Sequence, residues 1–540
     1  MKKYMIKRIL FSIFSLFVVV MVVMLLVYSL IDRSVIFQTD DTWNKKSNND
    51  RTMYEYAQYQ KYSYLTYVDY TSFLKNKYVE LVGEKYDKDK DFKADKKAIQ
   101  KGKDFSLDEN NEVVYSGSSE SVQEFLDEYR AKGCKIVYLE PMTYKNGKAK
   151  PGGNGYLIAV QEKNVVFRLL DYLKGFISAE NMHMVQDPEL PESERYIRFE
   201  KDPYSGLFAL VGNGTQHKYL LYFDDRFPFV HQNWLHLNLG VSYTTYRGQE
   251  ITDVINNPTG DLSKKLQQYP IMLGTDQYDE TAIDFHTLSY NTGTVSDKEK
   301  EQFPDKYTVY KYRRSGMSMI ENSFVIGLIA TAIAYAFGVP LGILMARRKD
   351  KLADKLGNGY IIFIMAVPSL AYIFMFAAVG TKLLGLPYKF ANAEVKILAY
   401  VLPTISLSLP WTGGLMKWMR RYMIDQMNAD YVKFARAEGL SEREIYKIHI
   451  SRNAFIPLVH GVPGAILGNL VGAIITETVY SVPGVGRLLT EAIAKHDNGV
   501  IVAVTVFYTS LSIISQILGD LLMAKYDPRI SLNADKGGGR

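Results

Sequence analysis

The sequence predicts an α-helical polytopic membrane protein, with six transmembrane helices and a large mixed α/β extracytoplasmic domain inserted between helices 1 and 2. Two observations predict this fold class. Hydrophobic residues, which make up 47% of the 540-residue chain, gather into one run near the N-terminus and five runs after residue 318. Each run approaches the length of about 20 residues that crosses the hydrocarbon core of a bilayer. Basic residues then cluster at alternate ends of these runs.

The first apolar run covers 9–31 and follows the basic start MKKYMIKR. Signal peptides also begin this way. However, this run is longer than the apolar core of a signal peptide, and the stretch YSLIDRS at its end contains no small-x-small cleavage site. We therefore expect residues 1–31 to form a cytoplasmic basic N-terminus and an uncleaved first transmembrane helix.

The five later runs predict a packed helical bundle. Proline and glycine are tolerated in membrane helices when neighbouring helices satisfy the freed backbone groups. Small residues, as in GVPGAILGNLVGAI (461–474), allow helices to approach closely. The runs cover 319–346, 360–381, 397–418, 456–482 and 500–525, and the candidate kinks are Pro340, Pro368, Pro403, Pro410 and Pro463.

Lysine and arginine orient the chain, because short cytoplasmic loops are enriched in them. Both termini are then cytoplasmic, residues 32–316 form an extracellular domain, 317–530 form a transmembrane core of five helices, and 531–540 form a cytoplasmic tail. The loops also explain the net charge of +6 through topology and anionic lipid, so we expect membrane lipid and no nucleic acid as partners. The basic residues on the cytoplasmic side are Lys2, Lys3, Lys7, Arg8, Arg347, Arg348, Lys349, Lys351, Arg420, Arg421, Lys433, Arg436, Arg443, Lys447 and Arg452.

The region 32–316 is large enough for a hydrophobic core of its own. Its single cysteine, Cys134, excludes an internal disulfide. The tyrosine-rich stretch 54–82 is typical of a helical face, with a peptide-stacking surface as the alternative. The patterns further predict a charged solvated face or flexible insert at 85–112, helices at 119–133 and 164–177, strands at 135–140 and 155–161, and helical spacing within 227–255.

Catalytic and metal-binding residues are not predicted anywhere in the chain. The domain has no Cys/His cluster, and its histidines are scattered, so each is interpreted as an ordinary surface or core residue. No Ser/His/Asp arrangement is supported. The four histidines in question are His183, His217, His231 and His236.

The energy source for any transport is expected in a partner. The chain has no G-x-x-x-x-G-K-[ST] phosphate-binding loop, so it is expected to bind no nucleotide itself. Proton-driven carriers need buried ionisable relays, and the acids near the ends of apolar runs are few, chiefly Glu477 and Asp520.

A charged segment at about 425–457 interrupts two apolar runs. The spacing predicts a helix over 430–438 that begins near Asp430. Gly439 then ends this helix, because glycine readily adopts the left-handed conformation just past a helix end. Ser441 and Glu444 form the S-x-x-E pattern of a capping box, which predicts a second helix. Such a corner could enter a groove on another protein, or it could be a simple helical loop on the membrane.

This segment resembles the cytoplasmic EAA loop of ABC-importer permeases, in the oligopeptide/dipeptide branch. The similarity rests on FARAEGLSEREIYKIHISRNAFIPLV and on further blocks in family order. These blocks are MKKYMIKRIL, NLGVSYTTYRGQEITDVI, FGVPLGILMARRKDK, IMAVPS, ITETVYSVPGVGRLL and GDLLMAKYDPRI. The large inserted domain, with its FPFVHQNW stretch, is similar to the long first permease subunit of Gram-positive oligopeptide importers.

The resemblance assigns the family's loop glycine to Gly439 and its alanine to Ala435. Lys433 replaces the family's acidic residue, and Arg452, Asn453 and Pro457 follow the peptide branch instead of the general motif. The implied ATPase-coupling residues are Ala435, Ala437, Glu438, Gly439, Leu440, Ser441, Glu444, Arg452 and Asn453. The candidate pathway or outer-gate residues are Glu477, Tyr480 and Pro483, and Glu477 either pairs with a peptide amine or holds the SVPGVG turn.

The resemblance implies a non-catalytic permease subunit of an ATP-driven oligopeptide importer, forming half of the translocation pathway. Its partners would be a second homologous permease, two ABC ATPase subunits that hold ATP and Mg, and an extracytoplasmic peptide-binding lipoprotein. Two alternatives stay open at this point. One is a permease for another solute such as nickel or a metallophore, and the other is a membrane receptor or sensor.

Overall fold

A computed structural model describes residues 2–37, 40–146, 148–183, 190–203, 206–215, 217–223, 230–246, 248–256, 267–270, 278–281 and 317–526. The expected tail 531–540, most of 257–316 and the side chain of His231 lie outside the described residues. The chain forms two compact units. We call Met24–Lys174 the inserted unit, and Met1–Val23 with Gly175–Arg540 the core unit.

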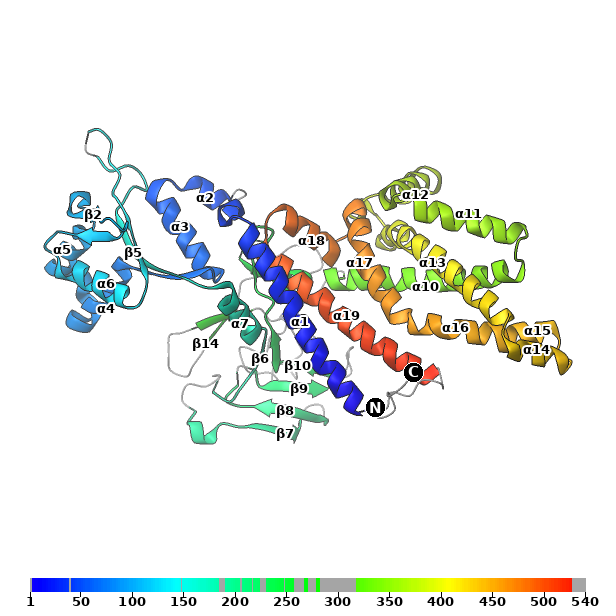
Figure 1. The fold of residues 1–540 in the computed structure, drawn as a ribbon. Helices are drawn as coiled ribbons and strands as arrows, with labels where there is room; N and C mark the ends of the chain where they lie inside the picture. Colours follow the sequence, from blue (N-terminus) through cyan, green and yellow to red (C-terminus); the bar gives the residue numbers. More distant parts are fainter. Residues whose placement is uncertain are drawn as a thin grey trace. The chain divides into compact units, whose positions relative to one another are not determined.

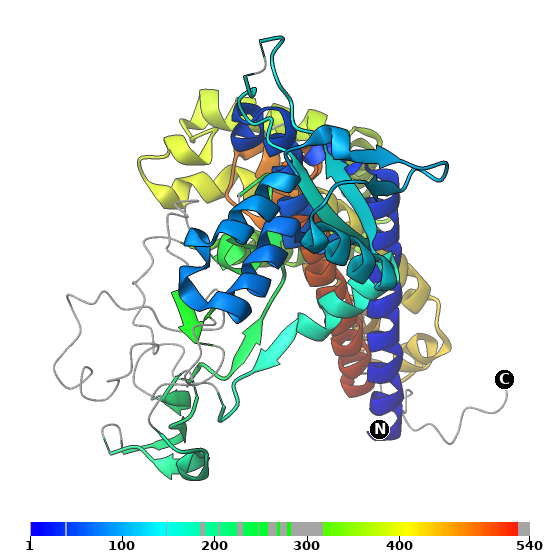
Figure 2. The ribbon, with the colours of Figure 1, turned by 90° about the vertical axis from the view of Figure 1, so that its left-hand side faces the viewer.

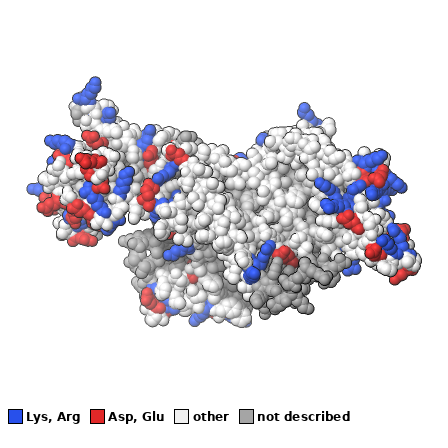
Figure 3. All heavy atoms as spheres, viewed as in Figure 1, with Lys and Arg blue, Asp and Glu red and all other residues white. Residues whose placement is uncertain are grey.

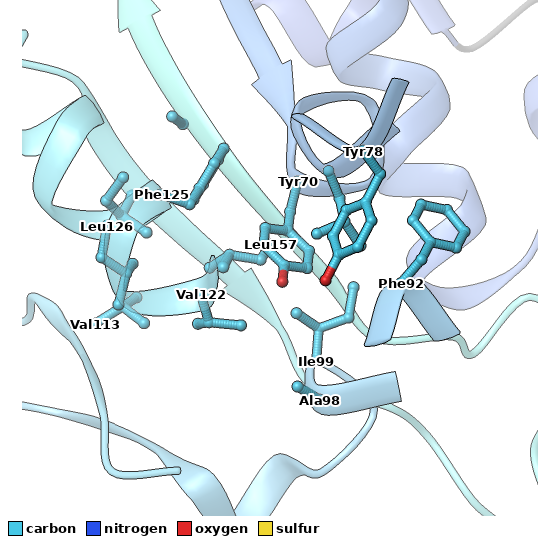
Figure 4. Close-up of a cluster of buried hydrophobic side chains, with 13 residues drawn as sticks. Tyr70, Tyr78, Phe92, Ala98, Ile99, Val113, Val122, Phe125, Leu126 and Leu157 are labelled. Atoms are coloured by element: carbon cyan, nitrogen blue, oxygen red, sulfur yellow. The ribbon is translucent and has the colours of Figure 1, made fainter. Parts of the chain in front are cut away.

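The inserted unit is built on a three-stranded antiparallel sheet with the order β1-β5-β4. Rings and aliphatic side chains from α4, α5, α6 and β5 meet in one core, in which Tyr70, Leu74, Phe125, Leu126 and Leu157 are fully buried (Figure 4). Its elements after helix α1 (Lys2–Leu30) are α2 (Asp41–Lys45), α3 (Asn48–Lys61), β1 (Leu65–Asp69), α4 (Tyr70–Val82), α5 (Lys90–Ala98), β2 (Phe105–Leu107), β3 (Val113–Tyr115), α6 (Glu120–Ala131), β4 (Lys135–Leu139), β5 (Tyr156–Glu162) and α7 (Val165–Gly175).

Most sequence predictions for this unit are confirmed. α6 begins after Ser119, whose hydroxyl accepts from the Val122 N–H, and Gly133 follows it at φ +73°. β4, β5 and α7 occupy the expected segments. Two interpretations hold only in part. The stretch 54–82 is largely helical, and α4 packs Tyr70 and Tyr78 into the core, but strand β1 interrupts it because it pairs with β5. The stretch 85–112 is mostly exposed, as expected for a solvated face, but it also contains α5, whose Phe92 is buried.

The β-rich part of the core unit corrects a further prediction. The described residues of 227–255 form short strands and the short helix α8, instead of a long amphipathic helix, because two of these strands pair with β9 and β6 and the other two pair with each other. The strands β10-β9-β8-β7 form one antiparallel sheet, and β11 pairs with β6. The elements are β6 (Ile177–Ala179), β7 (Ile197–Lys201), β8 (Phe208–Gly212), β9 (Tyr219–Phe223), β10 (Val230–Gln232), β11 (Leu235–Leu237), β12 (Val241–Ser242), β13 (Gln249–Glu250), α8 (Ile251–Asn256), β14 (Gln267–Pro270) and β15 (Tyr278–Thr281).

Helices make up the rest of the core unit (Figure 1). Those long and apolar enough to cross a bilayer as single helices, among the described residues, are Ile6–Leu30, Met319–Arg347, Val462–Tyr480 and Asn498–Tyr526. The helices are α10 (Met319–Arg347), α11 (Leu352–Ala366), α12 (Ser369–Leu384), α13 (Val401–Met427), α14 (Asp430–Ala437), α15 (Glu442–Glu444), a π-helix (Ile445–Ile450), α16 (Ser451–His460), α17 (Val462–Tyr480), α18 (Val485–Ala494) and α19 (Asn498–Tyr526).

Two expected crossings differ from straight apolar helices. The run at 360–381 breaks at Pro368, where the chain bends by 112° between α11 and α12. These two helices can therefore cross a bilayer only as one broken span. α13, which contains most of the run at 397–418, is too polar to count as a membrane span by composition alone. Its polar side chains Thr404, Ser406, Ser408 and Thr412 are buried, because α13 packs on α10, α11, α16 and α17 and has little surface left for lipid.

Glycines bring α10 and α13 into close contact, as the bundle prediction requires. A Cβ on Gly338 would lie 2.8 Å from the Leu415 Cβ, and one on Gly342 would lie 2.7 Å from the Met419 Cβ. Both distances are shorter than real Cβ contacts, so only glycine permits this backbone approach.

The first half of α1 runs beside α19 in both ribbon views (Figures 1 and 2). The Arg8 guanidinium lies 3.4 Å from the Asp520 carboxylate and donates to the Gln516 side chain at 3.2 Å. The start of α1 and the end of α19 therefore lie at the same end of the bundle.

A buried carboxylate joins the β-rich part to the helices of the core unit. Asp497, in the turn between α18 and α19, is fully buried. It accepts hydrogen bonds from the Ser242 hydroxyl at 2.6 Å and from the Tyr243 and Thr245 N–H groups at 3.2 and 3.1 Å, and its other oxygen accepts from the Val500 N–H at 3.2 Å. The segment that carries β12 is thus fixed to the start of α19.

Replacement of Asp497 by alanine should release this segment. The three donors in 242–245 would lose their acceptor while buried, at a cost of about 2–4 kcal/mol. We expect a lower thermal midpoint for the detergent-solubilised protein and faster protease cleavage near β12. Glu394→Ala, at an exposed loop carboxylate, is the control and should change neither; equal stability of both variants would contradict the role of Asp497.

Candidate functional site

The charged segment folds as a helix, a left-handed glycine and a second capped helix. α14 begins at Asp430, and Gly439 follows it at φ +84°. The Gly439 N–H donates to the Arg436 carbonyl at 3.1 Å, and the Leu440 N–H donates to the Ala435 carbonyl at 3.2 Å. These two bonds form a Schellman motif, which satisfies the last carbonyls of α14 and reverses the chain direction.

The second helix starts with the predicted capping box. The Ser441 hydroxyl accepts from the Glu444 N–H at 3.3 Å, and the Glu444 carboxylate accepts from the Ser441 N–H at 3.0 Å. The hydrogen bonds from the Ser441 side chain and N–H lower the pKa of the Glu444 carboxyl, so it stays ionised. An ion pair between Arg436 and Glu442, at 2.7 Å, closes the corner from α14 to α15.

One side of this corner is anchored in the bundle. Val432 and Ala435 on α14, and Ile445 and Ile450 on the π-helix, are buried and pack in one cluster with Met419, Met423 and Leu458. This cluster connects the corner to α13 and α16, which lead directly into the membrane helices. A displacement of the corner must therefore also displace these helices.

The opposite side of the corner is exposed and partly apolar. Ala437, Glu438, Gly439, Leu440 and Ser441 form the exposed tip. Next to it lie two apolar side chains that the sequence interpretation missed, Phe434 at 69% and Ile448 at 52% exposure. The sequence did hold a signal for them, because each is an apolar residue that helical spacing places on the same face as charged residues.

The last two predicted coupling residues lie after the corner in the chain. Arg452 is exposed and Asn453 half-buried, both in the first turn of α16, beyond the tip. The corner also contacts the α10–α11 turn, because the Arg347 guanidinium lies 5.3 Å from the centre of the Tyr446 ring. In Figure 3, Lys and Arg gather at the end of the core unit where Figure 1 places α14 and α15.

A bidentate ion pair joins α11 and α13 at the same end of the core unit as the corner. Arg420 on α13 donates to both carboxylate oxygens of Asp354 on α11, at 2.6 and 2.7 Å. Asp354 also accepts from the Asp350 N–H at 2.9 Å. Two parallel bonds of this kind set the orientation as well as the distance between the helices.

Glu477, at the far end of α17 from the corner, is fully buried. Its carboxylate accepts from the Ser323 hydroxyl of α10 at 2.6 Å and from the Arg487 N–H at 3.0 Å. A Cβ on Gly484 or Gly486 would collide with this carboxylate, so the SVPGVG turn wraps directly around it. This geometry favours the turn-holding interpretation of Glu477 over pairing with a peptide amine.

Tyr480 and Pro483 belong to the same arrangement. The Tyr480 ring is buried, and its hydroxyl lies 2.8 Å from that of Ser406 and donates to the Ile373 carbonyl at 3.2 Å. The Pro483 carbonyl accepts from the Asn322 amide at 2.7 Å. The three predicted gate residues therefore share one packed junction of α10, α12, α13 and α17, and the structure does not bring them near the loop residues.

The histidine interpretation needs a correction. His217 and His236 are not isolated, because both contact the buried carboxylate of Glu180. Strand pairing and the turn before β9 bring them together, and the sequence spacing contains no signal for this. Burial alone would raise the pKa of Glu180, but hydrogen bonds from His217 and His236 hold that pKa below its ordinary value. His183 is exposed and does not belong to this cluster.

Comparison with known proteins supports the family resemblance. The family described as "Binding-protein-dependent transport system inner membrane component" matches residues 338–532. The chain is 34% identical, over the full length of both chains, to the "Oligopeptide transport system permease protein AmiC" of Streptococcus pneumoniae serotype 4.

Shorter relatives match a smaller share of the chain. The "Dipeptide transport system permease protein DppB" of Lactococcus lactis is 29% identical over 39% of this chain and 69% of its own. A solved amino acid ABC transporter chain is 13% identical, covers 38% of this chain and 92% of its own, and has a TM-score of 0.31, a likeness too weak to bear on the fold.

The family match at 338–532 runs from within α10 to past the end of α19. This part of the chain contains the corner and the packed junction around Glu477. The full-length similarity extends it over the inserted unit as well. Such components are membrane permeases of transport systems that also contain a binding protein and an ATPase. The chain belongs to the inner-membrane permease components of binding-protein-dependent ABC transport systems.

Proposed function

We propose that this permease forms half of the translocation pathway of an ATP-driven oligopeptide importer. The observation that carries the proposal is the corner around Gly439, which has an exposed, partly apolar tip on a base buried against the bundle. The full-length similarity to a protein named an oligopeptide transport permease supports peptide as the cargo. The partners are a second homologous permease, two ATPases that bind ATP and Mg, and a peptide-binding lipoprotein outside.

The topology follows from the basic loops. The corner and both termini face the cytoplasm, residues 32–316 face the outside, and α13 provides the sixth crossing inside the bundle. The proximity of Arg8 to Asp520 supports this arrangement, because it brings the start of α1 and the end of α19 to one end. The outer domain shapes the mouth of the pathway and docks the binding protein.

Coupling proceeds through packed helices. ATP-driven closure of the ATPases moves the tip at 437–441, and the buried side chains Val432, Ala435 and Ile445 pass this motion to α13 and α16. Two packed arrangements of the bundle then open alternately to the two sides, as a rigid-body change. Glu477 holds the SVPGVG turn at the outer end of α17 rather than contacting cargo.

Uptake by reconstituted transporter tests the cargo. The permease, co-expressed with its candidate partners, should co-purify with ATPase subunits and take up labelled peptides of defined length in the presence of ATP. Uptake of nickel or a metallophore, but not of peptides, would reassign the cargo. Failure to associate with any ATPase would overturn the importer itself and favour a sensor.

Gly439→Val should uncouple ATP hydrolysis from transport. A Cβ at Gly439 meets no atom within 4 Å, so the change acts only through the positive φ, at a cost of about 1–2 kcal/mol for a β-branched residue. We expect normal membrane insertion and at least ten-fold less uptake. Gly439→Asn is the matched control, because asparagine tolerates this conformation, and it should retain most uptake. Wild-type uptake by the valine variant would exclude the coupling role of the turn.

Phe434→Ala should weaken ATPase binding. A ring that is 69% exposed in the isolated chain becomes an anchor when a partner covers it, and such anchors contribute about 2 kcal/mol or more to an interface. We expect more than ten-fold weaker retention of ATPase subunits in pull-down experiments. Phe374→Ala, at a 50% exposed ring on α12, is the control and should leave retention unchanged. Equal retention by both variants would remove Phe434 from the interface.

A further inference from the structure

We propose that Glu180, His217 and His236 bind a zinc ion in the β-rich part of the core unit, outside the membrane helices. Each residue offers one ligand atom, and these three atoms lie within 4.8 Å of one another. The inference concerns a site separate from the corner and from the Glu477 junction, so it stands independently of the transport function.

The fold brings the three ligands from three separate segments. Glu180 follows β6, and His236 lies at the centre of β11, whose pairing with β6 places His236 opposite Ser178. His217 comes from the turn between β8 and β9. The ligands are thus 37 and 19 residues apart in sequence but meet in space.

The distances suit an ion of this size. The Glu180 Oε1 atom lies 3.1 Å from the His236 Nε2 atom and also contacts the His217 Nδ1 atom. Zinc binds such atoms at 2.0–2.2 Å, so tetrahedral ligand atoms lie about 3.3 Å apart. A bound ion would replace the direct hydrogen bonds of Glu180 to the two histidines, and at the Glu180–His236 pair it would move the ligand atoms apart by a few tenths of an ångström.

The backbone around the ligands is held in place by other hydrogen bonds. The second oxygen of Glu180 accepts from the His217 N–H at 3.0 Å. The Glu180 N–H donates to the Trp234 carbonyl at 2.9 Å, and the Trp234 indole donates back to the Glu180 carbonyl at 3.1 Å. The Thr215 hydroxyl donates to the His217 carbonyl at 2.6 Å. Outer bonds of this kind orient metal ligands and raise affinity.

The donor set selects the metal. Two imidazoles with one carboxylate are a zinc donor set, whereas calcium and magnesium prefer oxygen ligands alone. The side chains of Glu180 and His217 are at most 1% exposed and that of His236 is 15% exposed, so the site opens to solvent only beside His236. A water molecule would complete the coordination from that side.

The site would strengthen a part of the protein that contains no disulfide. The only cysteine, Cys134, lies in the inserted unit, so the β-rich part has no covalent cross-link. Zinc would join β6, β11 and the turn before β9 at one point. Because metal bound only by the folded state stabilises it, removal of zinc should loosen these three segments together.

Metal binding by the full-length protein in detergent tests the proposal. After treatment with a chelator, the protein should take up one equivalent of Zn²⁺, and Co²⁺ in its place should give the visible absorption bands of tetrahedral coordination. Zn²⁺ should also raise the thermal midpoint. His236→Ala should weaken Zn²⁺ binding by at least about ten-fold and remove the Co²⁺ bands. Glu180→Gln, which keeps the size but not the charge of the carboxylate, should also weaken binding.

His183→Ala is the matched control, because His183 is exposed and lies outside the cluster, and it should bind Zn²⁺ like the wild type. No Zn²⁺ uptake by the wild type would overturn the proposal and leave a buried Glu–His hydrogen-bond network. Retained uptake by a folded His236→Ala variant would also overturn it. A peptide-uptake defect with normal Zn²⁺ binding would bear on the proposed transport function alone.

Discussion

Within a bilayer, backbone N–H and C=O groups must find their hydrogen-bond partners inside the protein, and the architecture of the core unit follows from this constraint. Regular helices meet it along most of their length. Where the chain turns, other groups must take over. At the end of α17 the carbonyl of Glu477 accepts from the Val482 N–H at 2.9 Å, and at Gly439, on the exposed corner outside the membrane helices, a Schellman motif closes the end of α14 in a similar way.

Buried carboxylates repeatedly accept hydrogen bonds where the chain turns or where segments meet. Glu477, Asp497 and Glu180 are buried, and each accepts a hydrogen bond from a backbone N–H of another segment. Asp354 is also buried, and its partner from another segment is the Arg420 side chain. Such a group fixes two segments at once, because its two oxygens can accept from donors far apart in sequence. An acid buried near a helix end of this protein can therefore organise a turn.

The sequence predicted well what depends on local chemistry. Helix starts and stops at Ser119, Gly439 and Ser441 follow from capping and conformational preferences that act within a few residues. The long apolar helices follow from composition. The corner could thus be drawn from residues 430–444 alone, and the resemblance of these residues identified the family.

What could not be predicted depends on contacts between distant segments. The acceptor role of Asp497 requires residues 242–245, and the meeting of His217, His236 and Glu180 requires the pairing of β6 with β11. Strand β1 within the tyrosine-rich stretch forms because β5, about ninety residues later in the numbering, pairs with it. The polar character of α13 is likewise explained only by the helices around it, since the sequence does not show which face meets lipid.

The open space around Gly439 has a consequence for how this permease can change over time. Because a Cβ at Gly439 would meet no atom within 4 Å, the shape of the corner is set by backbone conformation, by local hydrogen bonds and by the buried side beneath it. Side chains at Glu438 and Leu440 can then be exchanged without altering that shape. Under the proposed coupling role, different atoms would recognise the ATPase and transmit its motion, so a permease of this kind could adapt to a new ATPase without a change in its coupling helices.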